Sequence, residues 1–306
     1  MSLPPEYDRR VQLWTKQMTR ERLSTRTIHF YVETMHAVAS ILDTNSHPVL
    51  PKEIRPDDVR FLLDHLATEN YAVQTRKGYL SALRKWVKNG GGKTEGWPKA
   101  RLPHDRRPNV DWLTAEQARK LLDTDMSLLQ SAVINLELRQ GLRHVEVIRL
   151  RHCDIDYSTH LLTVIGKGPI GGKIRRIPMV PATEAALKVW QDLRDIWVQE
   201  GKERYPSSFT DPETVIVWRK AGRLYSYSEE GYGLDKVVTL PLNKQLDFHF
   251  SNHTLRRTFG RALYRAEVPV ATIAKILGHE STEVTLRYIG VDIDDMRNAM
   301  QKEIFA

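Results

Sequence analysis

The sequence predicts a mainly α-helical fold with one small β-hairpin, divided into two domains. Apolar side chains recur every three or four residues through most of the chain, which is the periodicity of an amphipathic helix. One pair of segments has β patterning around a glycine-rich stretch. The length of 306 residues fits two domains, and the balance of 41% apolar and 27% charged residues is that of a globular protein.

Three amphipathic helices are predicted in the first third of the chain, over residues 25–43, 57–69 and 73–89. The last of them carries an apolar stripe for packing. Beside the stripe lies a basic flank that can face phosphate groups, although an ordinary solvated surface has the same pattern. The basic residues of this flank, which we take as candidates for DNA binding, are Arg76, Lys77, Arg84, Lys85 and Lys88.

A change of composition places the domain boundary near residue 110. A glycine run stops the third helix, and the residues that follow are rich in proline and basic side chains, so we predict an extended linker over about 89–110. Thr114 and Gln117 then form a capping box that opens a new helix. The predicted domains are therefore 1–110 and 111–306.

The second domain is predicted to be mostly helical. Two β-patterned segments, 160–165 and 173–180, flank a glycine-rich tip and indicate a hairpin. A helix follows from Thr183 to about residue 200, and residues 201–250 are expected to form loops and short strands. Four further helices are predicted, over residues 253–266, 269–277, 281–289 and 294–304.

The charge distribution favours a polyanionic partner. The formal net charge is +8, and residues 1–110 hold 19 basic and 12 acidic residues, whereas residues 111–306 are nearly balanced. A membrane surface is a weaker fit, because no segment joins strong basicity to an exposed aromatic face. The sequence has no apolar run of bilayer length and no signal peptide, and its single cysteine, Cys153, fits a reducing compartment, so we expect a cytoplasmic location.

Several simpler chemistries are excluded by their spacing. The glycine-rich stretch 166–173 is no phosphate-binding loop, because Ile174 follows Lys173 where that motif needs serine or threonine. His249 and His253 stand four apart, as in a zinc helix, but no glutamate follows His249 and no third ligand is evident. No pair of acidic residues resembles a two-metal nuclease site. We therefore expect no metal and no cofactor.

What remains is a set of mainly basic residues around one tyrosine. In chain order the set comprises Arg143, Glu146, Lys167, His253, Arg256, His279 and Tyr288. The first two stand three apart and are expected on one helical face, and the lysine lies at the hairpin tip. His253 and Arg256 are expected on one face of a later helix. Each piece alone also has an ordinary structural interpretation, such as a buried ion pair, a core histidine or a packed tyrosine.

In this order and spacing, the set resembles the tyrosine recombinase (phage integrase) family, including the Xer-type recombinases. Arg143 in Gly-Leu-Arg matches the first arginine of the family signature, and Glu146 matches the acidic residue three positions on. Lys167 in Gly-Lys-Gly matches the hairpin lysine. The resemblance covers the whole chain, but the specific motifs lie in residues 111–306.

The later part of the signature is also present. His253 and Arg256 match the H-x-L-R box, His279 in Leu-Gly-His matches the late histidine, and Tyr288 matches the nucleophile. A few positions depart from the family pattern without removing a reacting group, and they leave the subfamily open. These are Val145, Arg257, Gly260 and the lengthened hairpin tip.

The resemblance implies a helical, SAM-like core-binding domain followed by a catalytic domain, the two closing around double-stranded DNA. The implied function is site-specific recombination. DNA strands are cleaved and rejoined through a 3′-phosphotyrosine intermediate, without metal or ATP, and pass through a Holliday junction. Four protomers are expected to form a tetramer on two DNA sites, with the tail helix 294–304 docked on a neighbour. We expect association with the nucleoid, and no separate arm-binding domain before residue 25.

The resemblance also implies a role for each residue. Arg143 and Arg256 would stabilise the charge on the phosphorane oxygens in place of a metal ion. Tyr288 would be the nucleophile, and its ordinary pKa of about 10 requires a base, for which His253 is the candidate. Lys167 would protonate the leaving oxygen, and His279 would hydrogen-bond the phosphate. Glu146 would support an arginine or a histidine.

Two other functions remain open on the sequence. A type IB topoisomerase uses similar chemistry but relaxes supercoils as a monomer, without strand exchange. A non-catalytic DNA-binding protein is favoured by the helix pair 269–277 and 281–289, which resembles a helix-turn-helix. The intact reacting set argues against pure binding, because binding alone does not need Tyr288 together with Lys167.

Overall fold

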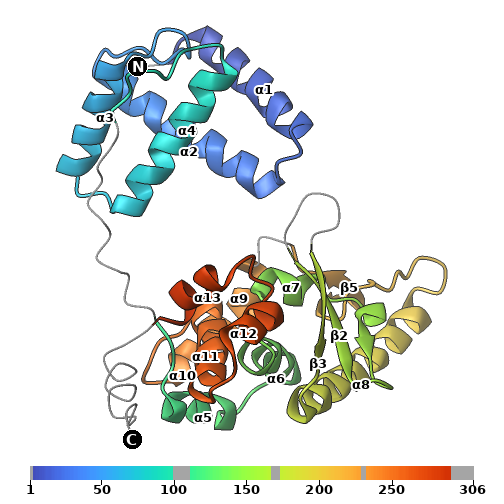
Figure 1. The fold of residues 1–306 in the computed structure, drawn as a ribbon. Coiled ribbons are helices and arrows are strands. Elements are labelled where there is room, and N and C mark those ends of the chain that lie inside the picture. Colours follow the sequence, from blue (N-terminus) through green and yellow to red (C-terminus); the bar gives the residue numbers. More distant parts are fainter. Residues whose placement is uncertain (1–2, 99–110, 167–172, 229–231, 291–306) are drawn as a thin grey trace, which may run out of the picture. The chain divides into compact units, whose positions relative to one another are not determined.

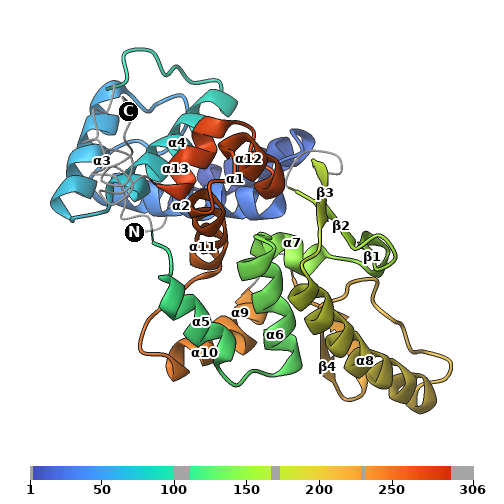
Figure 2. The ribbon, with the colours of Figure 1, turned by 60° about the horizontal axis from the view of Figure 1, so that its bottom comes forward.

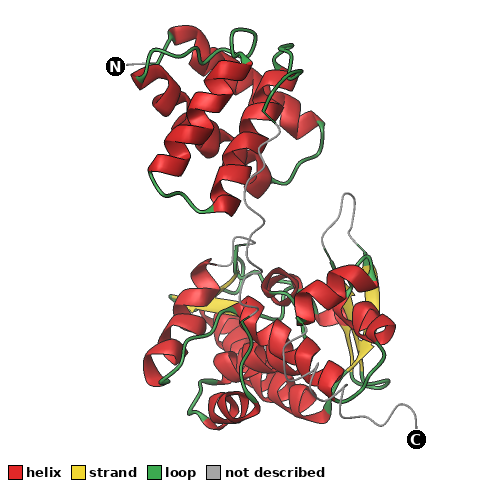
Figure 3. Ribbon diagram, turned by 60° about the vertical axis from the view of Figure 1, so that its left-hand side comes forward, coloured by secondary structure: helices red, strands yellow, loops and turns green. Residues whose placement is uncertain are grey.

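The computed structural model describes residues 3–98, 111–166, 173–228 and 232–290. The chain divides into two compact units, Met1–Pro108 and Asn109–Ala306, each built around its own apolar core (Figure 1). Helices dominate both units, and within the described residues strands occur only in the second (Figure 3). No helix in these residues is long and apolar enough to cross a membrane. The predicted mainly α fold class is confirmed.

The described part of the first unit is a bundle of α1 (Pro5–Arg20), α2 (Thr25–Thr44), α3 (Pro56–Thr68) and α4 (Val73–Asn89). The three helices predicted from the sequence are confirmed. Helix α1 was not predicted, although Tyr7, Val11, Trp14 and Met18 form a buried stripe at helical spacing. Trp14 packs edge-on against Trp86 of α4, with 5.1 Å between ring centroids, so α1 completes the aromatic core.

The structure places the first part of the predicted linker within the first unit. Asn89 is the last residue of α4, and Trp97 is buried in the core at 7% exposure. The glycines between them let the chain pass close to the connection between α2 and α3. A Cβ on Gly92 would lie 2.2 Å from the carbonyl oxygen of Pro51. The rest of the predicted linker, 99–110, lies outside the described residues.

The second unit is built on a central group of helices. Helix α5 (Ala115–Asp123) begins with the predicted capping box: the Gln117 N–H donates to Thr114 Oγ1 at 3.1 Å, and the Thr114 N–H donates to Gln117 Oε1 at 2.9 Å. Helix α6 (Leu128–Ile134) continues into a π-helical turn, η1 (Asn135–Arg139), and α7 (His144–Arg149) follows. Apolar side chains of α6 and η1 pack against α8 (Pro181–Arg204) and α11 (Asn252–Arg265).

A small antiparallel sheet lies beside α7 and α8 (Figure 2). Its strands are β1 (Ile155–Asp156), β2 (Leu161–Ile165) and β3 (Ile174–Pro178), preceded by a 3₁₀ turn, η2 (His152–Asp154). The predicted hairpin is confirmed, with Leu162 opposite Ile177 and Val164 opposite Arg175. Leu162, Val164 and Ile177 are buried, so one face of the sheet covers the core. The hairpin tip with Lys167 lies outside the described residues.

Residues 201–250 contain more helix than the sequence analysis predicted. The expected short strands are present as β4 (Val217–Lys220) and β5 (Arg223–Ser226). Two short helices, α9 (Tyr232–Val237) and α10 (Thr239–Gln245), take the place of loops. The buried residues Leu234 of α9, Val238 just before α10 and Leu242 of α10 recur every four positions, a helical spacing that the surrounding tyrosines and glycines obscure.

The described fold ends with three helices that the sequence predicted: α11, α12 (Val270–Leu277) and α13 (Thr282–Ile289). Their apolar side chains form a small cluster around Ile273, Leu277 and Ile289. Gly278 ends α12 in the left-handed conformation, with φ at +63°, so the chain reverses directly into His279. The predicted tail helix 294–304 lies outside the described residues.

Gly141 provides a test of how tightly α11 packs under the turn before α7. Its φ is +63°, and a Cβ there would lie 2.3 Å from Cδ1 of Phe259. Gly141→Ala should lower the free energy of unfolding of the second unit by about 2–4 kcal/mol, from the left-handed backbone and from overpacking together. Urea denaturation measures this loss.

Gly96→Ala is the matched control, because Gly96 has φ at +71° but only Pro56 Cγ near the added Cβ, at 3.8 Å. It should cost the first unit only about 1 kcal/mol, the backbone part of the penalty. Equal losses at the two positions would contradict the packing argument.

Candidate active site

The start of α7 brings Arg143 and Glu146 together. The sequence analysis placed both on one helical face, and this was wrong: Arg143 lies just before the helix, with the extended backbone of an N-cap residue (φ −73°, ψ 148°). Its backbone N–H donates to Glu146 Oε2 at 2.8 Å, and its Nη1 donates to Oε1 at 2.9 Å. The pair is therefore held by a helix cap as well as by charge. The cap also fixes the point from which the Arg143 side chain extends.

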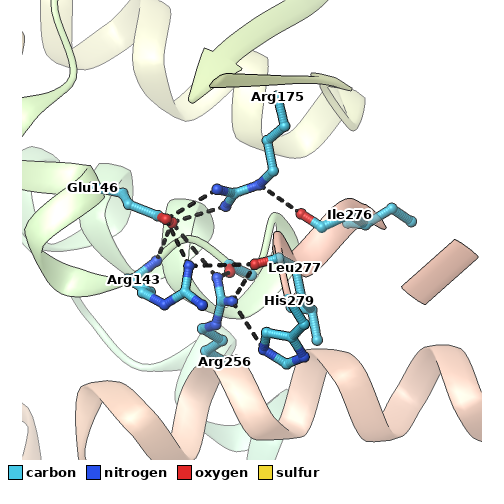
Figure 4. Close-up of polar contacts among 8 residues, drawn as sticks. Arg143, Glu146, Arg175, Arg256, Ile276, Leu277 and His279 are labelled. Atoms are coloured by element: carbon cyan, nitrogen blue, oxygen red, sulfur yellow. Dashed lines mark hydrogen bonds and ion pairs between the residues drawn. The ribbon is translucent and has the colours of Figure 1, made fainter. Parts of the chain in front are cut away.

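Glu146 gathers three guanidinium groups around one buried carboxylate (Figure 4). Besides Arg143, Arg175 of β3 pairs with it at two points, 2.9 Å from Nη1 to Oε1 and 2.8 Å from Nη2 to Oε2. Nη1 of Arg256, on α11, lies 3.6 Å from Oε2 of Glu146. The Glu146 side chain is only 1% exposed. One negative charge thus faces three positive ones, and the cluster keeps an excess of positive charge.

The same arginines contact the C-terminal end of α12. Arg256 donates to the carbonyl oxygen of Leu277, and Arg143 Nη1 donates to that oxygen at 3.4 Å. Arg175 Nε donates to the carbonyl oxygen of Ile276 at 2.8 Å. The last carbonyls of a helix have no partner within the helix and carry the negative end of its dipole. The end of α12 is therefore a second anchor for the three guanidiniums.

Burial and neighbouring charges set the protonation of this cluster. Burial raises the pKa of Glu146, but the hydrogen bonds and charge of Arg175, with the charge of Arg256, outweigh it and lower the pKa to about 2. Burial and the charge of Arg143 lower the pKa of Arg256 to about 10. At neutral pH the carboxylate is ionised and the guanidinium is protonated, so the excess positive charge persists.

Arg175 is a site residue that the sequence analysis missed. Side chains alternate along β3, and Arg175 stands two positions before Ile177, which is 3% exposed in the core. That spacing puts Arg175 on the inward face of the strand, whereas Arg176 is exposed. An arginine in step with a buried residue of a predicted hairpin is the signal that could have identified it.

His279 stands at the edge of the arginine cluster. Its Nε2 lies 3.3 Å from Nη2 of Arg256, and its Nδ1 lies 2.9 Å from the hydroxyl of Thr285. Because a guanidinium only donates, Nε2 accepts and Nδ1 carries the proton. Burial and the charges of Arg256 and Arg143 lower the pKa of His279 to about 4, so its ring is neutral at pH 7.

Tyr288 of α13 packs against His279, with ring centroids 5.0 Å apart and an interplanar angle of 75°. The guanidinium carbons of Arg256 and Arg257 lie 5.9 and 5.5 Å from the centroid of its ring. Its hydroxyl is buried and has no hydrogen-bond partner within the described residues. Burial raises the pKa of Tyr288 against the opposing effect of the two guanidiniums, so the phenol is protonated at neutral pH.

Two residues of the predicted set are not among the contacts described above. His253 occupies the first turn of α11 and is exposed, on the same helix as the buried Arg256. The histidine ring that packs on Tyr288 is that of His279. Lys167 lies outside the described residues. The structure thus brings together the two arginines, Glu146, His279 and Tyr288.

The basic flank predicted on α4 is divided between internal and exposed residues. Arg76 Nε donates to the carbonyl oxygen of Tyr71 at 2.9 Å, and Lys85 Nζ pairs with Glu21 at 2.6 Å, so these two make contacts inside the first unit. The exposed members of the flank are Lys77, Arg84 and Lys88.

The cluster in the second unit can bind and polarise a tetrahedral anion. The Arg143 side chain is 27% exposed, while Arg256 and Glu146 are each 1% exposed, so solvent reaches the cluster on the Arg143 side. Guanidiniums held in place beforehand stabilise the charge that develops on a phosphorane without reorganising. With a phenol beside a neutral histidine, the geometry suits phosphoryl transfer to the tyrosine oxygen.

Comparison with known proteins decides the family. The sequence profile described as the phage integrase family matches residues 111–294, more than half of the chain. The chain belongs to the phage integrase family. The matched segment contains Arg143, Glu146, Arg256, His279 and Tyr288. The resemblance to tyrosine recombinases drawn from the sequence is confirmed.

Relatives extend the similarity over both units. This integrase-family chain is 26% identical over 289 residues to the tyrosine recombinase XerC of Oceanobacillus iheyensis, covering 91% of this chain and 90% of that protein. It is also 26% identical over 308 residues to XerC of Brucella suis, covering 94% and 92%.

Solved structures share the fold. A variant of the Tn1549 transposon integrase in complex with transposon right end DNA has a TM-score of 0.67 at 16% identity, covering 96% of this chain and 99% of that one. The XerH recombinase bound to a palindromic difH substrate in a post-cleavage complex has a TM-score of 0.64 at 17% identity, covering 90% and 79%.

The two-point pairing of Arg175 with Glu146 should contribute measurably to the free energy of unfolding. Arg175→Ala should lower the free energy of unfolding of the second unit by about 3 kcal/mol, because the buried carboxylate loses two charged hydrogen bonds. Arg175→Lys should recover only part of this loss, since an ammonium lacks the planar fork that reaches both carboxylate oxygens. Urea denaturation checks both variants.

The neighbouring Arg176 supplies the control, because it is exposed on the other face of β3. Arg176→Ala should stay within about 0.5 kcal/mol of the unsubstituted protein. An Arg175→Lys variant as stable as the unsubstituted protein would show that charge alone, without the fork, holds the carboxylate.

The lowered pKa of His279 makes a prediction about acid. Ring-nitrogen NMR should find His279 neutral at pH 7, with its proton on Nδ1, and protonated only near pH 4. The unfolded chain takes up that proton near the ordinary pKa of about 6.5, while the folded chain does not. Acidification from about pH 6.5 to pH 4 should therefore destabilise the native protein more than its His279→Gln variant. Equal acid sensitivity of the two would refute the assignment.

Proposed function

We propose that this protein is a site-specific DNA recombinase of the Xer type, which cleaves and rejoins strands through a 3′-phosphotyrosine link to Tyr288. The observation that carries the proposal is the convergence of Arg143, Arg256 and His279 in one cluster anchored by Glu146, with Tyr288 packed beside it. The XerC relatives are named tyrosine recombinases, and the similar XerH structure is bound to its difH substrate.

In the proposed reaction the scissile phosphate lies against Arg143 and Arg256. The oxygen of Tyr288 attacks phosphorus and gives its proton to His253, while the bond from phosphorus to the 5′-oxygen breaks. The leaving oxygen takes a proton from Lys167. The two guanidiniums hold the charge on the phosphorane, which is the work that a metal ion does in other nucleases. Because the phosphotyrosine bond keeps the energy of the phosphodiester, a 5′-hydroxyl of another strand reverses the step without ATP.

His279 hydrogen-bonds the phosphate in this proposal, and that role requires a change at its ring. With Nδ1 carrying the proton and Nε2 accepting from Arg256, the neutral ring has no second donor. A phosphate oxygen at Nε2 needs a donor there, so binding must bring a proton to the ring or shift its tautomer. The negative charge of the phosphate favours the protonated ring.

The two units take different parts in the proposal. Residues 1–110 form the SAM-like core-binding domain, with Lys77, Arg84 and Lys88 of α4 as its candidates for phosphate contact, and the second unit is the catalytic domain. Four protomers assemble on two sites of double-stranded DNA, dock their tail segments, 294–304, on neighbours, and exchange strands through a Holliday junction. This substrate places the protein with the nucleoid in the cytoplasm.

The other two functions explain less. A type IB topoisomerase would relax any supercoiled plasmid, whereas a recombinase converts a plasmid with two copies of its site into recombinant circles. A protein that only binds DNA has no use for a buried phenol packed beside a cluster of guanidiniums. The match to the phage integrase family favours strand exchange over both.

Covalent capture tests the nucleophile without knowledge of the DNA site. A pool of nicked duplexes with randomised cores is mixed with the protein, and DNA that stays attached in detergent is recovered. The phosphotyrosine link is trapped because the short fragment next to the nick diffuses away. Capture by a site-specific enzyme should therefore enrich a set of related sequences. Tyr288→Phe should capture none, while its affinity for the enriched duplexes stays within roughly 3-fold of the unsubstituted protein.

Tyr264→Phe is the matched control, since Tyr264 packs in the same apolar cluster of C-terminal helices but has its cation contact with Arg261, which is not one of the three clustered arginines. It should capture DNA normally. Capture by the Tyr288→Phe protein, or no enrichment with the unsubstituted one, would contradict the proposed function.

A further inference from the structure

A second polar network connects α7 with η1, α9 and α11. Its centre is His144, the first residue of α7 and the neighbour of Arg143. His144 Nδ1 lies 2.7 Å from Oε1 of Glu137 in η1, and its Nε2 lies 3.6 Å from Oδ1 of Asp235 on α9. None of the three residues belongs to the recombinase signature described above, and the proposed reaction does not use them.

Glu137 is fully buried, so its ionised form needs a compensating cation. It lies in the π-helical turn, is 0% exposed, and its Oε2 has no hydrogen-bond partner within the described residues. Burial raises its pKa, and the hydrogen bond and charge of His144 oppose that rise. A π-helical turn within an α-helix is frequently found at functional sites. A buried carboxylate without a positive partner is strongly destabilising.

His144 is placed to supply the positive charge. A neutral imidazole has a donor on only one nitrogen, but here each nitrogen faces a carboxylate oxygen. Protonation gives the ring a donor on both sides and sets one positive charge between two negative ones. The His144 side chain is 15% exposed, so water screens this bridge only partly.

The bridge continues from Asp235 to the start of α11. Asn252, the first residue of that helix, donates its side-chain N–H to Oδ1 of Asp235 at 2.7 Å. Asn252 directly precedes His253, just as His144 directly follows Arg143. A single chain of contacts through His144, Asp235 and Asn252 therefore links the start of α7, next to Arg143, to the start of α11, next to His253. These two helices are far apart in the sequence.

We propose that His144 is a positioning residue: as a cation between Glu137 and Asp235, it holds the start of α7 against the start of α11 and so fixes Arg143 relative to His253. The inference rests on the proposed function, because it gives this spacing a catalytic consequence. A misplacement of about 1 Å at a catalytic group costs on the order of 100-fold in rate, so loss of the bridge should be visible in the cleavage step.

The charge on His144 can be measured without DNA. Ring-nitrogen NMR of the full chain, with the His144 signals identified by their absence from His144→Gln, should show both nitrogens protonated at pH 7. A neutral His144 under these conditions would overturn the proposal, whatever the protein does with DNA.

The positioning role is measured in single-turnover cleavage of a nicked duplex recovered by covalent capture. At saturating DNA, His144→Gln should slow adduct formation roughly 10- to 100-fold, while duplex affinity stays within roughly 3-fold. His160→Gln is the matched control. His160 Nδ1 lies 2.7 Å from Glu184 in the same kind of pair, but its side chain is 65% exposed in the turn between β1 and β2, so cleavage should not change.

The double variant Glu137→Gln/His144→Gln separates positioning from stability. Two neutral amides remove the unpaired buried carboxylate, so the melting temperature lost in His144→Gln should return. Adduct formation should stay slow, because the charged link to Asp235 is still missing. Recovery of both properties, or cleavage by His144→Gln at the unsubstituted rate, would reduce His144 to a structural residue. If the unsubstituted protein formed no adduct, the proposed function would fail, and NMR would still decide the charge.

Discussion

The buried carboxylate of Glu146 is the constraint on which the rest of the site depends. Arg143, Arg175 and Arg256 come from the start of α7, from β3 and from α11, and their like charges oppose their approach. They stay together because one carboxylate and the last carbonyls of α12 accept their hydrogen bonds. One negative charge cannot neutralise three positive ones, and the remainder is available to a phosphate.

The arginine cluster is prepared for an anion before any DNA arrives. Arg256 already donates to the carbonyl oxygens of Gly141 and Leu277 and lies against Nε2 of His279, so its geometry is set by the protein. A phosphate oxygen that enters there meets guanidiniums whose positions are already set, and only the His279 ring has to change its protonation or tautomer. Tyr288 is different, because its phenol is buried and protonated. Cleavage therefore needs both a bound phosphate and a proton acceptor, and the resting protein does not hold a reactive phenolate.

Local sequence patterns predicted most of the helices and the β2–β3 hairpin, because each depends on spacing within one segment. The signature residues were recognised from short local motifs and from the order of those motifs along the chain. Helix α1 carries an equally regular apolar stripe but was not predicted. Helices α9 and α10 are too short for the spacing of their apolar residues to stand out. Arg143 and Glu146 were paired correctly for the wrong reason, since their contact is a helix cap.

The residues that sequence reasoning missed are those defined by tertiary pairing. Arg175 becomes part of the site only where β3 packs beside α7 and the end of α12. Glu137, His144 and Asp235 come from three elements, and their pairing is set by how α9 and α11 fold back onto η1. No spacing within one segment encodes such contacts, whereas the alternation of β3 would at least have shown that Arg175 points inward.

Anion binding at the arginine cluster can be tested directly with tungstate, a tetrahedral oxyanion whose anomalous scattering marks its position in crystals of the protein. Tungstate should bind in one place, within hydrogen-bond distance of the guanidiniums of Arg143 and Arg256 and beside His279 and Tyr288. Tungstate bound elsewhere with this cluster empty, or guanidiniums that lie apart with no anion between them, would contradict a metal-free phosphoryl-transfer site built around Glu146.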